Sequence, residues 1–128
     1  MRLLLDTHVF LWTQDRPRRL GAVIELVGDP DNERFLSVAS VWEIAIKCAA
    51  GRLVLTEHPE RYVPDRREAL QAESLAVSEA HALAAARLPH LHGDPFDRML
   101  VAQAQMLELT IVTADRAVAQ YDVESILI

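Results

Sequence analysis

The sequence predicts a three-layer α/β domain, in which a central parallel sheet of about five strands is covered by helices on both faces. Short runs that are nearly all apolar alternate along the chain with longer amphipathic stretches. Strands buried on both faces have such continuous apolar runs, and the helices that connect parallel strands cover those faces. The 128 residues contain no internal repeat and no long linker, so we expect a single domain over residues 1–128.

The first strand and the helices after it are expected within the first 32 residues. Residues 2–5 form an apolar run of strand length, and Thr7 is a residue type that caps helices. Pro17 opens a further helical stretch that continues to Val27, since proline is favoured in the first turn of a helix. The turn-forming residues 28–32 then end this stretch.

The second strand is expected over residues 35–38, and the helix after it over residues 40–50. Ser40 and Glu43 have the S-x-x-E spacing of a capping box, in which two side chains satisfy free N–H groups of the first turn. Gly51 is placed to end this helix.

The remaining residues are expected to add three strands and three main helices. Ser78 is a capping residue before an alanine-rich stretch. Asp94 followed by Pro95 combines an N-cap with proline at the first helical position. The predicted strands cover residues 75–77, 109–112 and 125–128, and the predicted helices cover residues 59–71, 79–88 and 95–107.

The composition excludes several classes of protein. A single cysteine, Cys48, allows neither an internal disulfide nor a cysteine-based zinc site. No apolar run approaches the ~20 residues that cross a bilayer, and Asp6 interrupts the N-terminal run too early for a signal peptide. We therefore expect a cytoplasmic protein with no membrane partner. The net charge of −6 is unfavourable for binding RNA, so local basic patches such as Arg16, Arg18 and Arg19 would have to attract it.

Four carboxylates are expected at one edge of the sheet. Asp6 and Asp115 directly follow predicted strands, while Glu43 and Asp97 lie near the starts of predicted helices. Ligands bind to parallel sheets at the carboxyl ends of the strands. Clustered carboxylates cannot all stay ionised without a cation, and oxygen ligands select a hard ion. The pattern therefore predicts a site for Mg²⁺, or Mn²⁺, formed by Asp6, Glu43, Asp97 and Asp115.

Each acid also has a structural interpretation. Aspartate and glutamate are favoured near helix N-termini through capping and the helix dipole. Glu43 can belong to the capping box with Ser40 and pair with Lys47 one turn later, and Asp115 can cap the last helix. Convergence of four acids from separate segments favours a functional site. The role of Asp94 stays open among a cap, a metal ligand and a residue that supports a ligand.

Four blocks of the sequence carry a resemblance to a known family. They read, in order, LLLDTH at residues 3–8, SVWEIAIK at 40–47, DPFDR at 94–98 with LVAQA at 100–104, and TAD at 113–115. The chain closely resembles the PIN-domain ribonucleases, specifically the VapC-type toxins of bacterial toxin–antitoxin pairs. The resemblance covers essentially the whole chain.

This resemblance implies a Mg²⁺-dependent endoribonuclease that is usually a homodimer and is silenced by a small antitoxin protein. It also implies hydrolysis of RNA to a 5′-phosphate and a 3′-hydroxyl. Matched by position, Asp6, Glu43, Asp97 and Asp115 fall on the family's acidic active-site positions, and Asp6 and Asp97 are the firmest metal contacts. One apolar helical face is expected to support self-association and to bind an antitoxin helix. This face carries Val9, Trp12 and Leu20.

Three alternatives concern other functions and residues. A receiver-type signalling module would need an acidic pair after the first strand and a lysine after the fifth, and the sequence has neither. A catalytically inactive PIN-like domain that binds RNA or protein stays open, although all four acids are present. His90 and His92 could suggest a transition-metal site, but without a third ligand we expect both to be solvated.

Overall fold

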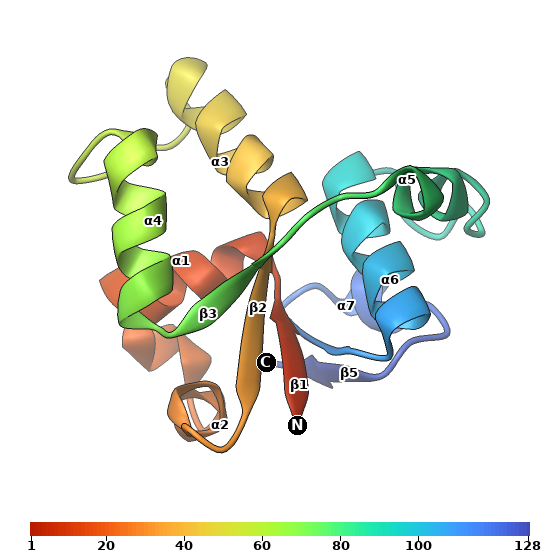
Figure 1. Ribbon diagram of the computed structural model, residues 1–128, viewed down its shortest axis with the longest axis horizontal. Coiled ribbons are helices and arrows are strands. Elements are labelled where there is room, and N and C mark those ends of the chain that lie inside the picture. Colours follow the sequence, from red (N-terminus) through yellow and green to blue (C-terminus); the bar gives the residue numbers. More distant parts are fainter.

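The computed structural model describes residues 1–128 and confirms the expected sheet of parallel strands between two layers of helices (Figure 1). Five strands pair in the order β3-β2-β1-β4-β5, so the chain builds outward from β1 in both directions. All four pairings are parallel. The strands are β1 (Arg2–Leu5), β2 (Glu33–Ser37), β3 (Ala72–Leu75), β4 (Thr110–Thr113) and β5 (Ser125–Leu127).

Helices cover both faces of this sheet (Figure 1). One face carries α1 (Thr7–Asp15), the 3₁₀ helix η1 (Pro17–Leu20), α2 (Val23–Gly28), α3 (Val38–Ala49) and α4 (Pro59–Ala69). The other face carries α5 (Glu79–Ala86), α6 (Pro95–Leu107) and α7 (Arg116–Ala119). Side chains alternate along β1, so Leu3 and Leu5 enter the core on the first face and Leu4 enters the core on the second. No helix has both the length and the apolar character needed to cross a bilayer.

Two element predictions differ from the structure. The third strand covers residues 72–75 rather than 75–77, because β3 lies at the edge of the sheet and exposes Glu73 and Ser74. An edge strand does not have the continuous apolar run that marks the central strands. The single helical stretch expected from Pro17 to Val27 is divided into η1 and α2 at Gly21, whose φ of +56° lies in the left-handed region that favours glycine.

The apolar face expected to bind partners is part of the core. Val9 and Leu20 are fully buried, because η1 folds back against α1 and both pack on the sheet. Trp12 is only partly buried. The expectation of an exposed binding face at these residues is therefore wrong. The largest exposed apolar side chain is instead Trp42 of α3, which is 63% exposed and contacts the Phe96 ring edge-on.

Candidate active site

Asp6 lies at the carboxyl end of the central strand β1, where α1 begins. It is the N-cap of α1, because its Oδ1 accepts a hydrogen bond of 2.8 Å from the Val9 N–H; the expected cap, Thr7, is the first helical residue. Its Oδ2 accepts a 2.6 Å hydrogen bond from the Thr113 hydroxyl at the end of β4. Helix α1 and strand β4 thus each hold one oxygen of a carboxylate that is only 5% exposed.

Glu43 lies inside α3 and contacts the start of α1. Its Oε1 accepts a 2.6 Å hydrogen bond from the Thr7 hydroxyl, and its Oε2 lies 2.6 Å from Lys47 Nζ. Glu43 is 4% exposed, so this carboxylate is buried and paired on both oxygens. Thr7 is a site residue that sequence reasoning missed, since nothing in its local sequence reveals a partner 36 residues away.

The capping box expected for Ser40 and Glu43 is wrong. Strand β2 ends at Ser37, and the Ser37 hydroxyl caps α3 by accepting a hydrogen bond from the Ala39 N–H. The observed cap therefore lies three residues before the expected one. Ser40 lies in the first turn, with a buried hydroxyl that has no hydrogen-bond partner. Glu43 is too far along the helix to cap it, whereas its expected ion pair with Lys47 is present.

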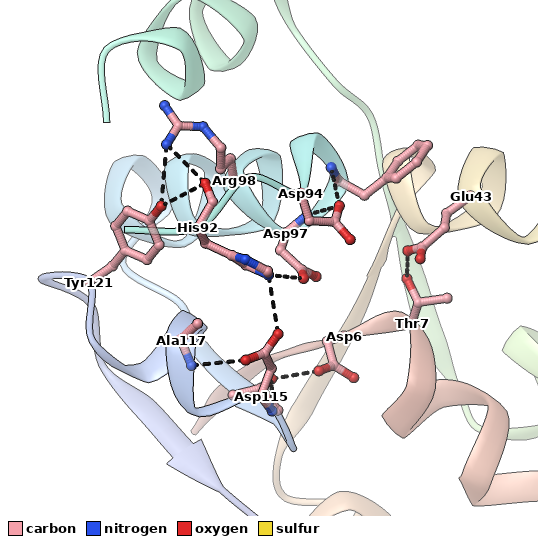
Figure 2. Close-up of polar contacts among 12 residues, drawn as sticks. Asp6, Thr7, Glu43, His92, Asp94, Asp97, Arg98, Asp115, Ala117 and Tyr121 are labelled. Atoms are coloured by element: carbon pink, nitrogen blue, oxygen red, sulfur yellow. Dashed lines mark hydrogen bonds and ion pairs between the residues drawn. The ribbon is translucent and has the colours of Figure 1, made fainter. Parts of the chain in front are cut away.

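Asp97 and Asp94 lie at the N-terminus of α6, as expected. Asp94 is the N-cap, because its Oδ1 accepts hydrogen bonds from the Phe96 and Asp97 N–H groups. Asp97 is in the first turn, and its Oδ2 lies 2.9 Å from His92 Nε2. One oxygen of Asp94 is therefore used for capping, while its second oxygen faces the same space as Asp97 (Figure 2).

Asp115 both caps a helix and takes part in the acidic cluster. It is the N-cap of α7, because its Oδ1 accepts a 2.8 Å hydrogen bond from the Ala117 N–H. Its Oδ2 lies 3.1 Å from His92 Nε2. The two interpretations offered by the sequence are therefore compatible, since each uses a different oxygen. Figure 2 shows the carboxyl groups of Asp94 and Asp97, at the start of α6, converging with those of Asp6 and Asp115 from other segments.

His92 occupies a position that the sequence analysis did not predict. Its Nε2 lies between Asp97 and Asp115, and its side chain is 24% exposed rather than solvated. Arg98 holds the segment that carries it: its guanidinium donates to the carbonyls of Ala85, Leu88, Pro89 and, at 3.4 Å, His92. Only the spacing to the Asp94 cap could have indicated that this histidine lies near the acids.

The clustered acids line a cavity of about 490 Å³. Its acidic residues are Asp6, Glu43, Asp94, Asp97 and Asp115. Its nitrogen-bearing residues are His8, Trp12, Arg19, Lys47, His92 and Arg116. The structure therefore brings together all four acids predicted from the sequence, and surrounds them with cationic side chains on an acidic protein.

The family model for the PIN domain matches residues 3–124 of this chain. The protein belongs to the PIN-domain family. Ribonuclease VapC16 of Mycobacterium tuberculosis is 43% identical over 56 residues. That match covers 44% of this chain and 40% of the relative, so it spans less than half of the length of either protein.

Solved structures show the same PIN fold. VapBC2 from Rickettsia felis, bound to a DNA fragment from its promoter, matches with a TM-score of 0.73 and 12% identity, over 100% of this chain and 99% of that chain. FitAcB from Neisseria gonorrhoeae matches with a TM-score of 0.64 and 23% identity, over 96% and 95% of the two chains. At these identities the likeness establishes the fold of the PIN domain.

The acidic cluster of this PIN domain carries more negative charge than its surroundings neutralise. Burial raises the pKa of Asp6, although hydrogen bonds from Thr113 and Val9 lower it. Burial and the charge of Asp94 raise the pKa of Asp97 to about 6. Burial lowers the pKa of His92, but contact with Asp97 and the other nearby acids outweighs it, so the net shift is upward. Each shift favours uptake of positive charge.

The donor atoms fit a divalent cation. One ligand atom each from His92, Asp94 and Asp97 lies within 4.8 Å of the others. Carboxylate oxygens are the ligands that Mg²⁺ and Mn²⁺ prefer, and Mg²⁺ keeps several waters beside one or two carboxylates. Five acids line the same cavity as three Lys or Arg side chains, and this excess of carboxylates is suited to a hydrated ion.

Asp97→Asn is expected to make the metal-free protein more stable at pH 7.5. A carboxyl whose pKa rises from 3.8 to about 6 on folding binds its proton more tightly in the folded state, so its contribution to stability falls as the pH rises through that window. Asparagine removes this cost, and we expect a gain of about 1–3 kcal/mol at pH 7.5 and little change at pH 4. Urea unfolding in EDTA at both pH values measures it; a variant less stable than wild type at pH 7.5 would contradict the origin assigned to the shift.

Proposed function

We propose that this PIN domain is a divalent-metal-dependent endoribonuclease, and that it is the toxin of a type II toxin–antitoxin pair. The observation that carries the proposal is the convergence of Asp6, Glu43, Asp97 and Asp115 on one cavity. Four acids from four segments of the fold have no structural task that would require them to face one another. RNA is the proposed substrate because the relative from Mycobacterium tuberculosis is named a ribonuclease. We further propose that residues 1–128 act as a single domain.

The proposed ligands of the ion are Asp6, Asp97 and Asp115. Glu43 is the fourth acid of the proposed metal site. Mg²⁺ is the proposed ion and Mn²⁺ the alternative, since both accept oxygen ligands. When bound, a divalent ion lowers the pKa of a water molecule and neutralises charge on the phosphate. Asp6 and Asp97 are suited to hold it because their positions are set by the backbone of α1 and of α6.

Glu43 is proposed to orient the attacking water. Thr7 and Lys47 each hold one of its oxygens, so the carboxylate has a fixed direction. Each oxygen still has a further lone pair with which to accept a hydrogen bond from water. In the proposed hydrolysis a water oxygen attacks phosphorus and the bond from phosphorus to the 3′ oxygen breaks. The leaving oxygen takes a proton, so the products end in a 5′-phosphate and a 3′-hydroxyl.

Cationic residues around the cavity support an anionic substrate. Arg19 and Arg116 are exposed at the cavity, and Lys47 is partly buried there. On a chain with net charge −6, such a local patch is what RNA binding requires, because the protein as a whole repels phosphates. In this arrangement the acidic side chains bind the ion and the surrounding cationic side chains bind the phosphates of the RNA, as a nuclease requires.

The proposed protein partners are an antitoxin and a second copy of this chain. The similar solved structures include VapBC2 from Rickettsia felis and FitAcB from Neisseria gonorrhoeae. We propose that the protein acts in the cytoplasm, where an inhibitor would protect cellular RNA from it. We propose that the inhibitor is a small antitoxin encoded beside the toxin.

Expression in a bacterial host tests this proposal. Induction of the chain alone should stop growth, and mapping of transcript ends should reveal new 5′-phosphate ends at defined positions. Co-expression of the adjacent reading frame should restore growth and remove the new ends. If growth and transcripts are unaffected although the folded protein accumulates and binds RNA, the domain is a catalytically inactive RNA-binding module instead.

A further inference from the structure

Three residues on one wall of the acidic cavity take no part in the chemical step of the proposed hydrolysis. They are His8 and Trp12 of α1 and Arg19 of η1. The His8 and Arg19 side chains are exposed, and Trp12 is partly buried. None of the three side chains can supply an oxygen ligand to Mg²⁺, and the charge proposed to bind the RNA backbone explains Arg19 but not the rings of His8 and Trp12.

The fold holds these three side chains against one another. His8 and Trp12 are four residues apart in α1, and therefore lie on the same face of the helix. Their ring centroids are 5.9 Å apart, with the planes inclined by 41°. The chain then turns back through η1 and places the Arg19 guanidinium carbon 5.0 Å from the centre of the Trp12 ring. The result is a cluster of three flat, π-bearing groups.

Trp12 is anchored as well as accessible. Its indole packs against the core cluster on the α1 face of the sheet while the residue also lines the cavity. A fixed aromatic ring loses little conformational freedom when a ligand stacks on the group, which favours binding. Arg19 adds a guanidinium plane, and such planes stack on nucleobases in RNA recognition as aromatic rings do.

The cluster lies at a suitable distance from the acids for one ligand to reach both. Asp6 caps α1, and Trp12 follows it by six residues, which corresponds to about 9 Å along a helix. A nucleotide whose phosphate lies at Asp6 has its own base, or the base of its neighbour, within this range. A nucleic-acid strand therefore matches both parts of the cavity. Its phosphate fits the ion held by the acids, and its flat base fits the three π-bearing side chains.

We propose that His8, Trp12 and Arg19 form a nucleobase subsite, which stacks an unpaired base of the RNA strand beside the phosphate that is cut. This inference rests on the proposed ribonuclease function and adds the residues that would hold a base of the substrate. A base inside a duplex is already stacked and paired, so the subsite selects single-stranded RNA. Stacking tolerates every base, because each has a π face, so this subsite gives little sequence preference.

Binding without cleavage tests the subsite. The full chain carrying Asp6→Asn, which removes catalysis, is titrated against a fluorescein-labelled single-stranded RNA of mixed sequence, and against the same RNA with abasic positions. Adding Trp12→Ala should weaken binding to the intact RNA about 5- to 150-fold, the usual loss for one stacked base. The same Trp12→Ala change should hardly alter the affinity of the protein for the abasic RNA. Trp12→Phe should retain most of the binding, and Trp42→Ala, outside the cavity, should retain all of it.

A second measurement does not depend on the alanine variant folding. In a Trp42→Phe protein Trp12 is the only tryptophan, and its fluorescence should be quenched by the intact RNA but not by the abasic RNA. Equal affinity of Trp12→Ala and its parent for intact RNA, or equal quenching by both RNAs, would overturn the subsite. If the wild-type chain still cuts RNA in that case, the ribonuclease proposal survives and only the subsite falls. If the chain neither binds nor cuts RNA, both fall.

Discussion

Asp6→Asn is expected to reduce RNA cleavage by about 10²- to 10⁴-fold while leaving the fold intact. Asparagine has the same shape and retains one carbonyl oxygen, so it can still cap α1 through the Val9 N–H. It removes the negative charge from the centre of the acidic cluster and with it a proposed ligand of the ion. The loss should appear in the initial rate of cleavage, with an unchanged circular dichroism spectrum.

The matched control for this variant is Asp31→Asn. Asp31 is exposed in the turn before β2, at the opposite end of the sheet from the cavity. The Asp31→Asn variant has the same change of charge and volume as Asp6→Asn but lies far from the cavity, so it should cut RNA at the wild-type rate. Full activity in Asp6→Asn, or an equal loss in both variants, would remove Asp6 from the proposed metal site.

Glu43→Gln should likewise reduce cleavage by about 10²- to 10⁴-fold with little change in melting temperature. Glutamine can still accept the hydrogen bond from Thr7, but it cannot form the ion pair with Lys47 or offer a charged oxygen. Since α3 is capped by Ser37, the variant loses no helix cap. The stability change is therefore expected to be small compared with the catalytic change.

Initial rates in saturating Mg²⁺, measured beside thermal unfolding, decide the role of Glu43. Glu25→Gln, an exposed change on α2, provides the control for loss of one acidic charge. A Glu43→Gln protein that unfolds at a much lower temperature yet cuts RNA at the wild-type rate would assign Glu43 a structural role alone.

The central strands and the acids were predictable from the sequence because local signals and the fold agree there. The apolar run before Asp6 can only be a buried strand, and the Asp94–Pro95 pair starts α6 at the expected residue. Parallel strands then bring their carboxyl ends to one edge whatever the loops do. The convergence of Asp6 and Asp115 follows from that topology, and α6, which leads back to the start of β4, places Asp97 at the same edge.

The predictions that failed depend on contacts between distant segments. Ser37 and Ser40 are equally good caps by residue type, and the extent of β2 pairing decides between them. His92 lies in a loop whose position is set by Arg98 through several carbonyl groups. Val9 belonged to a face that was expected to be exposed, but η1 covers that face in the structure. Periodicity shows which face of a helix is apolar without showing what covers it.

The measurement that tests the account most directly is the dependence of cleavage on a divalent ion. The purified full chain is incubated with single-stranded RNA over a range of Mg²⁺ concentrations, with Asp6→Asn prepared in parallel to expose contaminating nuclease. The account predicts a rate that saturates with Mg²⁺, disappears in excess EDTA and returns when Mg²⁺ or Mn²⁺ is restored. Cleavage by the wild-type chain that continues undiminished in excess EDTA would contradict it.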